Sequence, residues 1–196
     1  MNSGSAKPLA SISKMIRADH THVLSVFHRF RNDAPPRTKQ ALVDTICLAL
    51  QIHAQLEEEI LYPAIAEVDP ALVERNIPEH EQMQGLMSEL HELEPGLSRF
   101  DDAFLELMRV VIHHVADEET VLLPQAETLL AERLPELGVQ FARRRRQLML
   151  PRAAEMTRNA VRAMPAKTML VGAGALLAGT YVLRYALKKG QSSDDS

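Results

Sequence analysis

Histidines and glutamates occur in a repeated pattern along this chain. Two segments read His-x-x-x-Glu-Glu, beginning at His53 and His114, and each has a proline ten residues after its histidine. Four residues of α-helix turn by about 400° and rise about 6 Å, so each His and the first Glu share one face. Imidazole and carboxylate groups at this spacing are typical metal ligands. The pattern therefore pairs His53 with Glu57, and His114 with Glu118.

Two more histidines extend this pattern into an internal repeat. His20 and His80 lie 60 residues apart, and the two His-x-x-x-Glu segments lie 61 residues apart. The chain thus indicates two helix pairs that carry the same ligand set. Two His and one Glu per half suit two metal ions that share the carboxylates and bind each imidazole terminally. The predicted metal ligands are His20, His53, Glu57, His80, His114 and Glu118.

The alternative is a metal-free bundle with hydrogen-bonded histidines in its core. That arrangement would bury four imidazoles and two carboxylates with no Arg or Lys on the same helix faces, at a large desolvation cost. Bound cations offset this cost, so we favour the metal site. Imidazole and carboxylate ligands suit iron, manganese and zinc alike, and the residues alone do not choose among them.

The other polar residues near the ligands fall outside the expected site. Helical phase turns His22 about 200° from His20, and His91 lies about 16 Å along the helix from His80. We expect surface or neighbouring positions for four histidines: His22, His28, His91 and His113. We expect solvent around three glutamates: Glu58, Glu59 and Glu119. The single cysteine, Cys47, is expected to pack within its helix, and it excludes an intramolecular disulfide.

Four amphipathic segments are predicted to position these ligands. Apolar residues recur at three- and four-residue steps over about residues 12–32, 38–69, 78–95 and 98–134, with residues 71–76 adding a turn or two before the third segment. Aromatic residues make up 4% of the chain and Trp is absent, which argues against a β-sandwich or a nucleotide-binding sheet. We predict an all-α fold with an up-down-up-down four-helix bundle over residues 10–135.

The C-terminal part differs in charge. Residues 1–142 hold 11 Lys and Arg against 23 Asp and Glu, whereas residues 143–190 hold 11 against 1. We predict a basic helical connector over 136–167, a C-terminal apolar helix that spans a membrane over 168–187, and a polar tail over 188–196. Eight basic residues precede the uncharged stretch 168–183 and three follow it, which places the bundle on the cytoplasmic side.

Two alternatives to the membrane anchor stay open. Sixteen uncharged residues span only about 24 Å against about 30 Å of hydrocarbon, so the segment could instead be an apolar helix that docks on the bundle or on another subunit. A basic tail for nucleic acid is the other alternative, but the acidic bundle predicts no nucleic-acid partner. The N-terminus has no apolar region of the kind found in secretory signals.

The ordered set His20, His53-x-x-x-Glu57, His80, His114-x-x-x-Glu118, with Leu-Tyr-Pro and Leu-Leu-Pro after the glutamates, resembles the hemerythrin-like HHE cation-binding family over residues 10–135. The resemblance implies a bundle around two iron ions, an oxo- or hydroxo-bridged di-iron centre, in which the two Glu bridge and the four His bind terminally. Oxygen-carrying hemerythrins offer another His four residues after the third-helix His, and Gln84 stands there in this chain.

Fewer nitrogen ligands leave more metal positions for a small ligand. The resemblance therefore implies a protein that binds or reacts with O₂, peroxide or NO in sensing, storage or detoxification, rather than a reversible O₂ carrier. A catalase-like or peroxidase-like enzyme that decomposes hydrogen peroxide is the alternative function, and a metal-free membrane scaffold is a more distant one.

Overall fold

The computed structural model describes residues 11–163, and within this range every regular element is a helix. The elements are α1 (Ile12–Phe27), α2 (Pro36–Leu56), η1 (Glu57–Leu61), α3 (Tyr62–Ala66), α4 (Ala71–Glu74), α5 (Ile77–Glu92), α6 (Ser98–Asp117), η2 (Glu118–Leu122), α7 (Leu123–Leu129), α8 (Leu134–Met149), η3 (Leu150–Arg152) and α9 (Ala153–Arg162). The predicted all-α fold is confirmed for the described residues.

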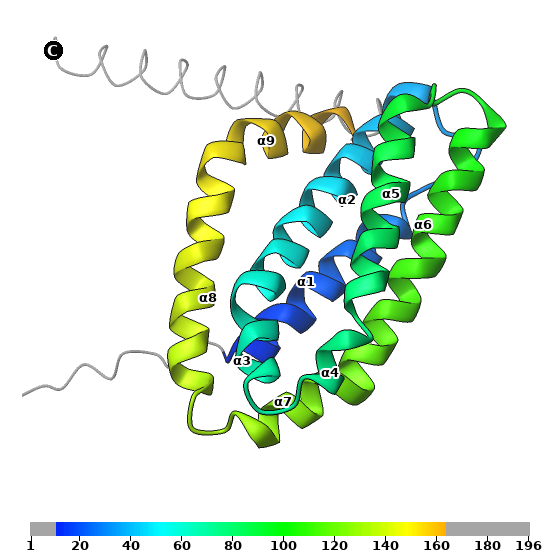
Figure 1. Ribbon diagram of the computed structural model, residues 1–196. Helices are drawn as coiled ribbons and strands as arrows, with labels where there is room; N and C mark the ends of the chain where they lie inside the picture. Colours follow the sequence, from blue (N-terminus) through cyan, green and yellow to red (C-terminus); the bar gives the residue numbers. More distant parts are fainter. Residues whose placement is uncertain (1–10, 164–196) are drawn as a thin grey trace, which may run out of the picture. The chain divides into compact units, whose positions relative to one another are not determined.

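Helices α1, α2, α5 and α6 form the bundle (Figure 1). Successive members run in opposite directions, and α1 packs on α2 while α5 packs on α6. Each helix buries one face, as its apolar stripe predicts. At one end of the bundle the ring of Phe104 lies 5.5 Å from that of Phe27 and 4.1 Å from that of Phe30. The bundle thus has a packed apolar core on which polar ligands can be held rigidly.

Helix α8 packs along the bundle as a further long helix (Figure 1). The sequence pattern predicted a basic helical connector here, and the structure shows that the helix also has a buried apolar face. Leu137, Phe141 and Leu148 lie in the same core cluster as Ile12 and Ile16 of α1. Two of its arginines contact acidic residues of the bundle: Arg144 pairs with Glu59 at 2.6 Å, and Arg145 pairs with Asp19. Residues 134–162 belong to the same compact unit as the bundle.

Two π-helical turns interrupt the helices that carry the glutamates. The predicted helical segments 38–69 and 98–134 run through Pro63 and Pro124, and η1 and η2 end two residues before these prolines. A proline lacks an N–H, and its ring clashes with the carbonyl four residues earlier in an α-helix. The wider π turn removes this clash, so the chain stays helical through each proline.

The apolar segment 168–187, predicted to span a membrane, lies outside the described residues. Within residues 11–163 no helix is both long enough and apolar enough to cross a membrane.

Candidate metal centre

The structure brings all six predicted ligands into the middle of the bundle. Each helix of the bundle supplies one histidine: His20 comes from α1, His53 from the last turn of α2, His80 from α5 and His114 from α6. Glu57 and Glu118 are the first residues of η1 and η2. Each of the six residues is at most 3% exposed. They form two groups with ligand atoms within 4.8 Å of one another: His20, His53, Glu57 and Glu118 in one group, and Glu57, His80 and His114 in the other.

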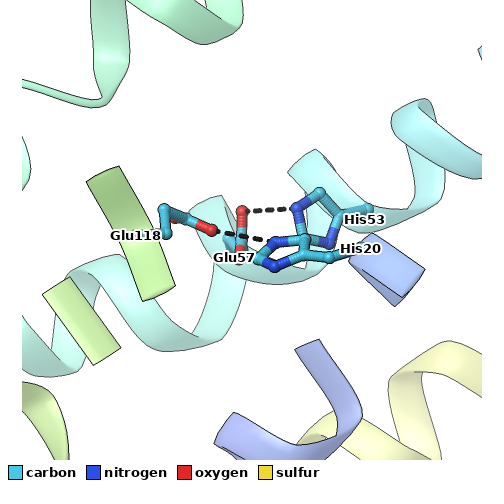
Figure 2. Close-up of side chains that lie close together, drawn as sticks. All are labelled: His20, His53, Glu57 and Glu118. Carbon is cyan, nitrogen blue, oxygen red and sulfur yellow. Dashed lines mark ion pairs between the residues drawn. The ribbon is translucent and has the colours of Figure 1, made fainter. Parts of the chain in front are cut away.

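The two carboxylates lie between the two pairs of imidazoles. Figure 2 shows the first group, where His53 Nε2 lies 3.2 Å from Glu57 Oε2 and His20 Nε2 lies 3.2 Å from Glu118 Oε2. The same oxygen of Glu57 is 3.5 Å from His80 Nε2, and the same oxygen of Glu118 is 3.5 Å from His114 Nε2. Each carboxylate therefore faces one imidazole of each pair, as a bridging ligand would.

Burial keeps the histidines ready to bind a metal. Desolvation lowers the pKa of His53 to about 3, although the charge of Glu118 opposes it, and desolvation also lowers the pKa of His80. Both rings are therefore neutral at physiological pH, with a lone pair available as a ligand.

The carboxylates carry opposite shifts. Burial, together with the charge of Glu118, raises the pKa of Glu57. Burial also acts to raise the pKa of Glu118, but the close approach of His20 and the charges of His114 and His53 outweigh it and lower this pKa to about 2. Two carboxylates in one dry pocket resist being ionised together, and a cation between them would remove that conflict.

Buried polar atoms without hydrogen-bond partners support the same conclusion. Within residues 11–163 these atoms include Nε2 of His20, Nε2 of His53, Oε1 of Glu57 and Oε2 of Glu118. Such orphaned atoms are rare in a folded core because each has lost its contact with water. Here they face one another in a small region, so the donor set fits divalent cations.

Acidic side chains hold the outer nitrogen of three of the four imidazoles. Nδ1 of His20 lies 2.9 Å from Glu119, Nδ1 of His80 lies 3.0 Å from Glu58, and Nδ1 of His114 lies 3.0 Å from Glu79. A carboxylate there accepts the Nδ1 proton, which leaves the inner Nε2 free as a ligand.

The prediction that Glu58 and Glu119 are solvated is therefore incomplete. Both side chains are partly exposed, but each reaches a histidine of the opposite half of the repeat. The signal was present in the sequence: the second Glu of each His-x-x-x-Glu-Glu segment recurs at the same 61-residue spacing as the first. The third glutamate, Glu59, instead pairs with Arg144 at 2.6 Å.

Tyr62 is a further site residue that helical phase alone missed. Its hydroxyl donates to Glu118 Oε1 at 3.0 Å and lies 3.2 Å from His80 Nε2. In an α-helix a residue five places after Glu57 points about 140° away from it. The π turn of η1 brings the fifth residue back to the same face. The corresponding position in the other half is Leu123, so the phenol belongs to one half only.

The remaining predicted non-ligands lie outside the cluster. His22, His28, His91 and His113 are exposed, and His113 Nδ1 lies 2.8 Å from Glu79, beside His114. Gln84 stands where oxygen-carrying hemerythrins have a second histidine on the third helix. Its side chain is exposed, so it does not serve as a ligand in place of that histidine. Cys47 is buried, and burial raises its pKa to about 12, consistent with packing.

A bundle with two histidine pairs joined by shared carboxylates is the architecture of a cation-binding helical protein. The family profile of the Hemerythrin HHE cation binding domain matches residues 11–126. The chain belongs to the hemerythrin HHE cation-binding family.

Two known proteins are similar to parts of this chain. A DNA nickase of Nostoc sp. is 29% identical over 120 residues, which are 61% of this chain and 34% of that protein. The chain therefore spans about a third of the length of this curated relative. The crystal structure of a hemerythrin HHE cation binding domain-containing protein from Mycobacterium kansasii has a TM-score of 0.63 at 21% identity, and the match covers 79% of this chain and 99% of that one. This second likeness concerns the fold.

Proposed function

We propose that the centre holds two iron ions and that the protein binds or reacts with O₂, peroxide or NO in sensing, storage or detoxification. The observation that carries the proposal is the pair of donor groups that share Glu57, with Glu118 facing an imidazole from each group. Membership of the family favours iron among the metals that imidazole and carboxylate accept. Bound iron would supply redox chemistry and positions for a small ligand.

The chain's own residues would prepare this site for a small ligand. Each metal would have two imidazoles and a share of two carboxylates, and the exposed Gln84 adds no ligand. Tyr62 supplies an O–H donor on the side of His80. Burial of all six ligands keeps bulk water away, so polar contacts there are strong.

Metal analysis of the purified full chain tests this proposal. We expect two irons per chain and an optical spectrum that changes when the anaerobically reduced protein meets O₂, NO or peroxide. Rapid gas evolution from hydrogen peroxide would identify the alternative, a peroxide-decomposing enzyme. A chain that takes up fewer than two irons at saturating metal would contradict the proposal.

We also propose a cytoplasmic bundle attached to a membrane through residues 168–187. The charge asymmetry on the two sides of this segment supports this orientation. Membrane flotation of the full chain and of a chain truncated after Arg162 tests it. Equal recovery of both in the soluble fraction at low salt would contradict the anchor.

No nucleic-acid partner is proposed. Residues 1–142 have 12 more acidic than basic residues, and such a surface repels a phosphate backbone. The nickase activity named for the Nostoc relative belongs to a protein of which this chain matches 34%.

A further inference from the structure

One of the four imidazoles lacks the outer carboxylate contact that the others have. Outer acceptors lie 2.9–3.0 Å from Nδ1 of His20, His80 and His114. By the repeat, Asp19 should serve His53 as Glu79 serves His114, because each acidic residue directly precedes the first His of its half. Asp19 Oδ2, however, lies 4.0 Å from His53 Nδ1, and that buried nitrogen has no hydrogen-bond partner among the described residues.

Arg145 of α8 contacts Asp19 instead. Its guanidinium donates to Asp19 Oδ1, so the carboxylate is engaged by a cation instead of by the imidazole. The pair is largely sheltered, with side chains 28% and 12% exposed for Arg145 and Asp19. Helix α8 lies beyond residues 11–126, the part of the chain that matches the family. The competitor therefore comes from the extension and not from the bundle.

We propose that Arg145 is a positioning residue that withdraws Asp19 from His53 and so makes the metal held by His20 and His53 exchange faster than the metal held by His80 and His114. The inference rests on the proposed pair of metals. An outer carboxylate fixes the ring of a metal-bound histidine and makes it a stronger ligand, and its loss weakens metal binding about 10- to 100-fold. The C-terminal extension thereby makes the two metal positions of a nearly two-fold symmetric site differ in their exchange rates.

Arg144 offers a matched control on the same helix. It makes a two-nitrogen contact to Glu59, at 2.6 and 2.8 Å, and so also ties α8 to the bundle. Glu59 also accepts from Gln55, and within residues 11–163 it has no hydrogen bond or ion pair with a histidine. A change at Arg144 therefore removes a similar tie between α8 and the bundle without freeing an acceptor for an imidazole.

Release of ferrous iron to a colorimetric chelator, under anaerobic conditions, tests the proposal on the full chain. Wild type should release one metal in a fast phase and the other in a slow phase. Arg145→Met, which keeps the apolar stem, should slow the fast phase about 10- to 100-fold, because Asp19 can turn to His53. Arg144→Met should leave both phases unchanged. A single phase in wild type, or equal changes in the two variants, would overturn the proposal.

A double variant tests whether Arg145 acts through Asp19. Adding Asp19→Ala to Arg145→Met removes the acceptor, and the fast phase should return. If the phase that is fast in wild type stays slow in this double variant, Asp19 is not the intermediary. The metal content of wild type separates the two hypotheses: fewer than two irons contradicts the proposed function, whereas two irons released at one rate contradicts only this inference.

Discussion

At the scale of single residues, three of the four imidazoles of the site have an outer carboxylate on Nδ1. Glu58 and Glu119 directly follow the two shared carboxylates, and each faces an imidazole of the opposite half. Each Glu-Glu pair thus supplies a ligand and an outer acceptor from adjacent positions. This arrangement makes the six ligands and their supports separable by mutation.

The shared carboxylates are expected to be indispensable for metal content. Glu57→Ala or Glu118→Ala removes a ligand that faces both imidazole pairs, so iron should fall from two per chain to one or none. His22→Ala and His91→Ala change exposed residues and should retain two. Elemental analysis checks this, and equal iron in all four variants would contradict the assignment.

The outer acceptors are expected to change affinity and not stoichiometry. Glu119→Gln weakens the acceptor at His20 Nδ1, so metal affinity should fall about 10- to 100-fold while two metals still bind at saturation. Glu81→Gln alters an exposed carboxylate of α5 and serves as the control. Competition with a chelator measures both. An unchanged affinity in Glu119→Gln would assign that contact no role.

At the scale of elements, the π turns and α8 decide what the bundle can do. The turn η1 rotates Tyr62 toward Glu118 and His80, which an uninterrupted α-helix would not do. Helix α8 covers one side of α1 and α2 and delivers Arg145 to Asp19. The π turns begin at the two shared carboxylates, Glu57 and Glu118, whereas α8 changes the surroundings of the ligands without supplying one.

Helix α8 is expected to contribute strongly to stability. Phe141 is fully buried in the core cluster, so Phe141→Ala should lower the free energy of unfolding by about 3–5 kcal/mol. Val139 on the same helix is 51% exposed, and Val139→Ala should change it by less than about 0.5 kcal/mol. Urea denaturation measures both. Equal effects would mean that α8 is a loosely attached connector.

At the scale of the whole molecule, the buried titratable groups link stability to pH. Below pH 6.5 the unfolded chain binds protons at His53 and His80 that the folded chain does not, because burial lowers both pKa values. Stability is therefore lost as the pH falls from about 6.5. The raised pKa of Glu57 acts in the opposite direction: above about pH 4.5 the unfolded chain releases a proton that the folded chain keeps.

The metal-free protein is thus expected to be most stable near pH 6.5. Between pH 4.5 and 6.5 the two histidines outweigh the one glutamate, and from pH 6.5 to about 8, below the range in which the raised pKa of Cys47 matters, the glutamate acts alone. Thermal unfolding of metal-free protein across pH 4–9 measures the profile. Glu57→Gln should abolish the decline between pH 6.5 and about 8 and keep the acid decline. A wild-type profile that rises steadily to pH 9 would contradict this account.

The sequence by itself determined the all-α fold, the family and the set of clustered residues. These follow from local geometry, because an i,i+4 step in a helix places His53 beside Glu57 wherever the helix lies. The 60- and 61-residue spacings then required the two halves to face each other.

Only the tertiary structure decided which groups surround the ligands. Tyr62 depends on a π turn that shifts helical phase, and this turn relieves a proline clash rather than following from apolar periodicity. Asp19 and Arg145 are 126 residues apart, so no helical rule connects them. Local spacing specifies neighbours on one helix, whereas contacts between helices depend on how the helices pack. This packing leaves His53 without the outer acceptor that its counterpart His114 has.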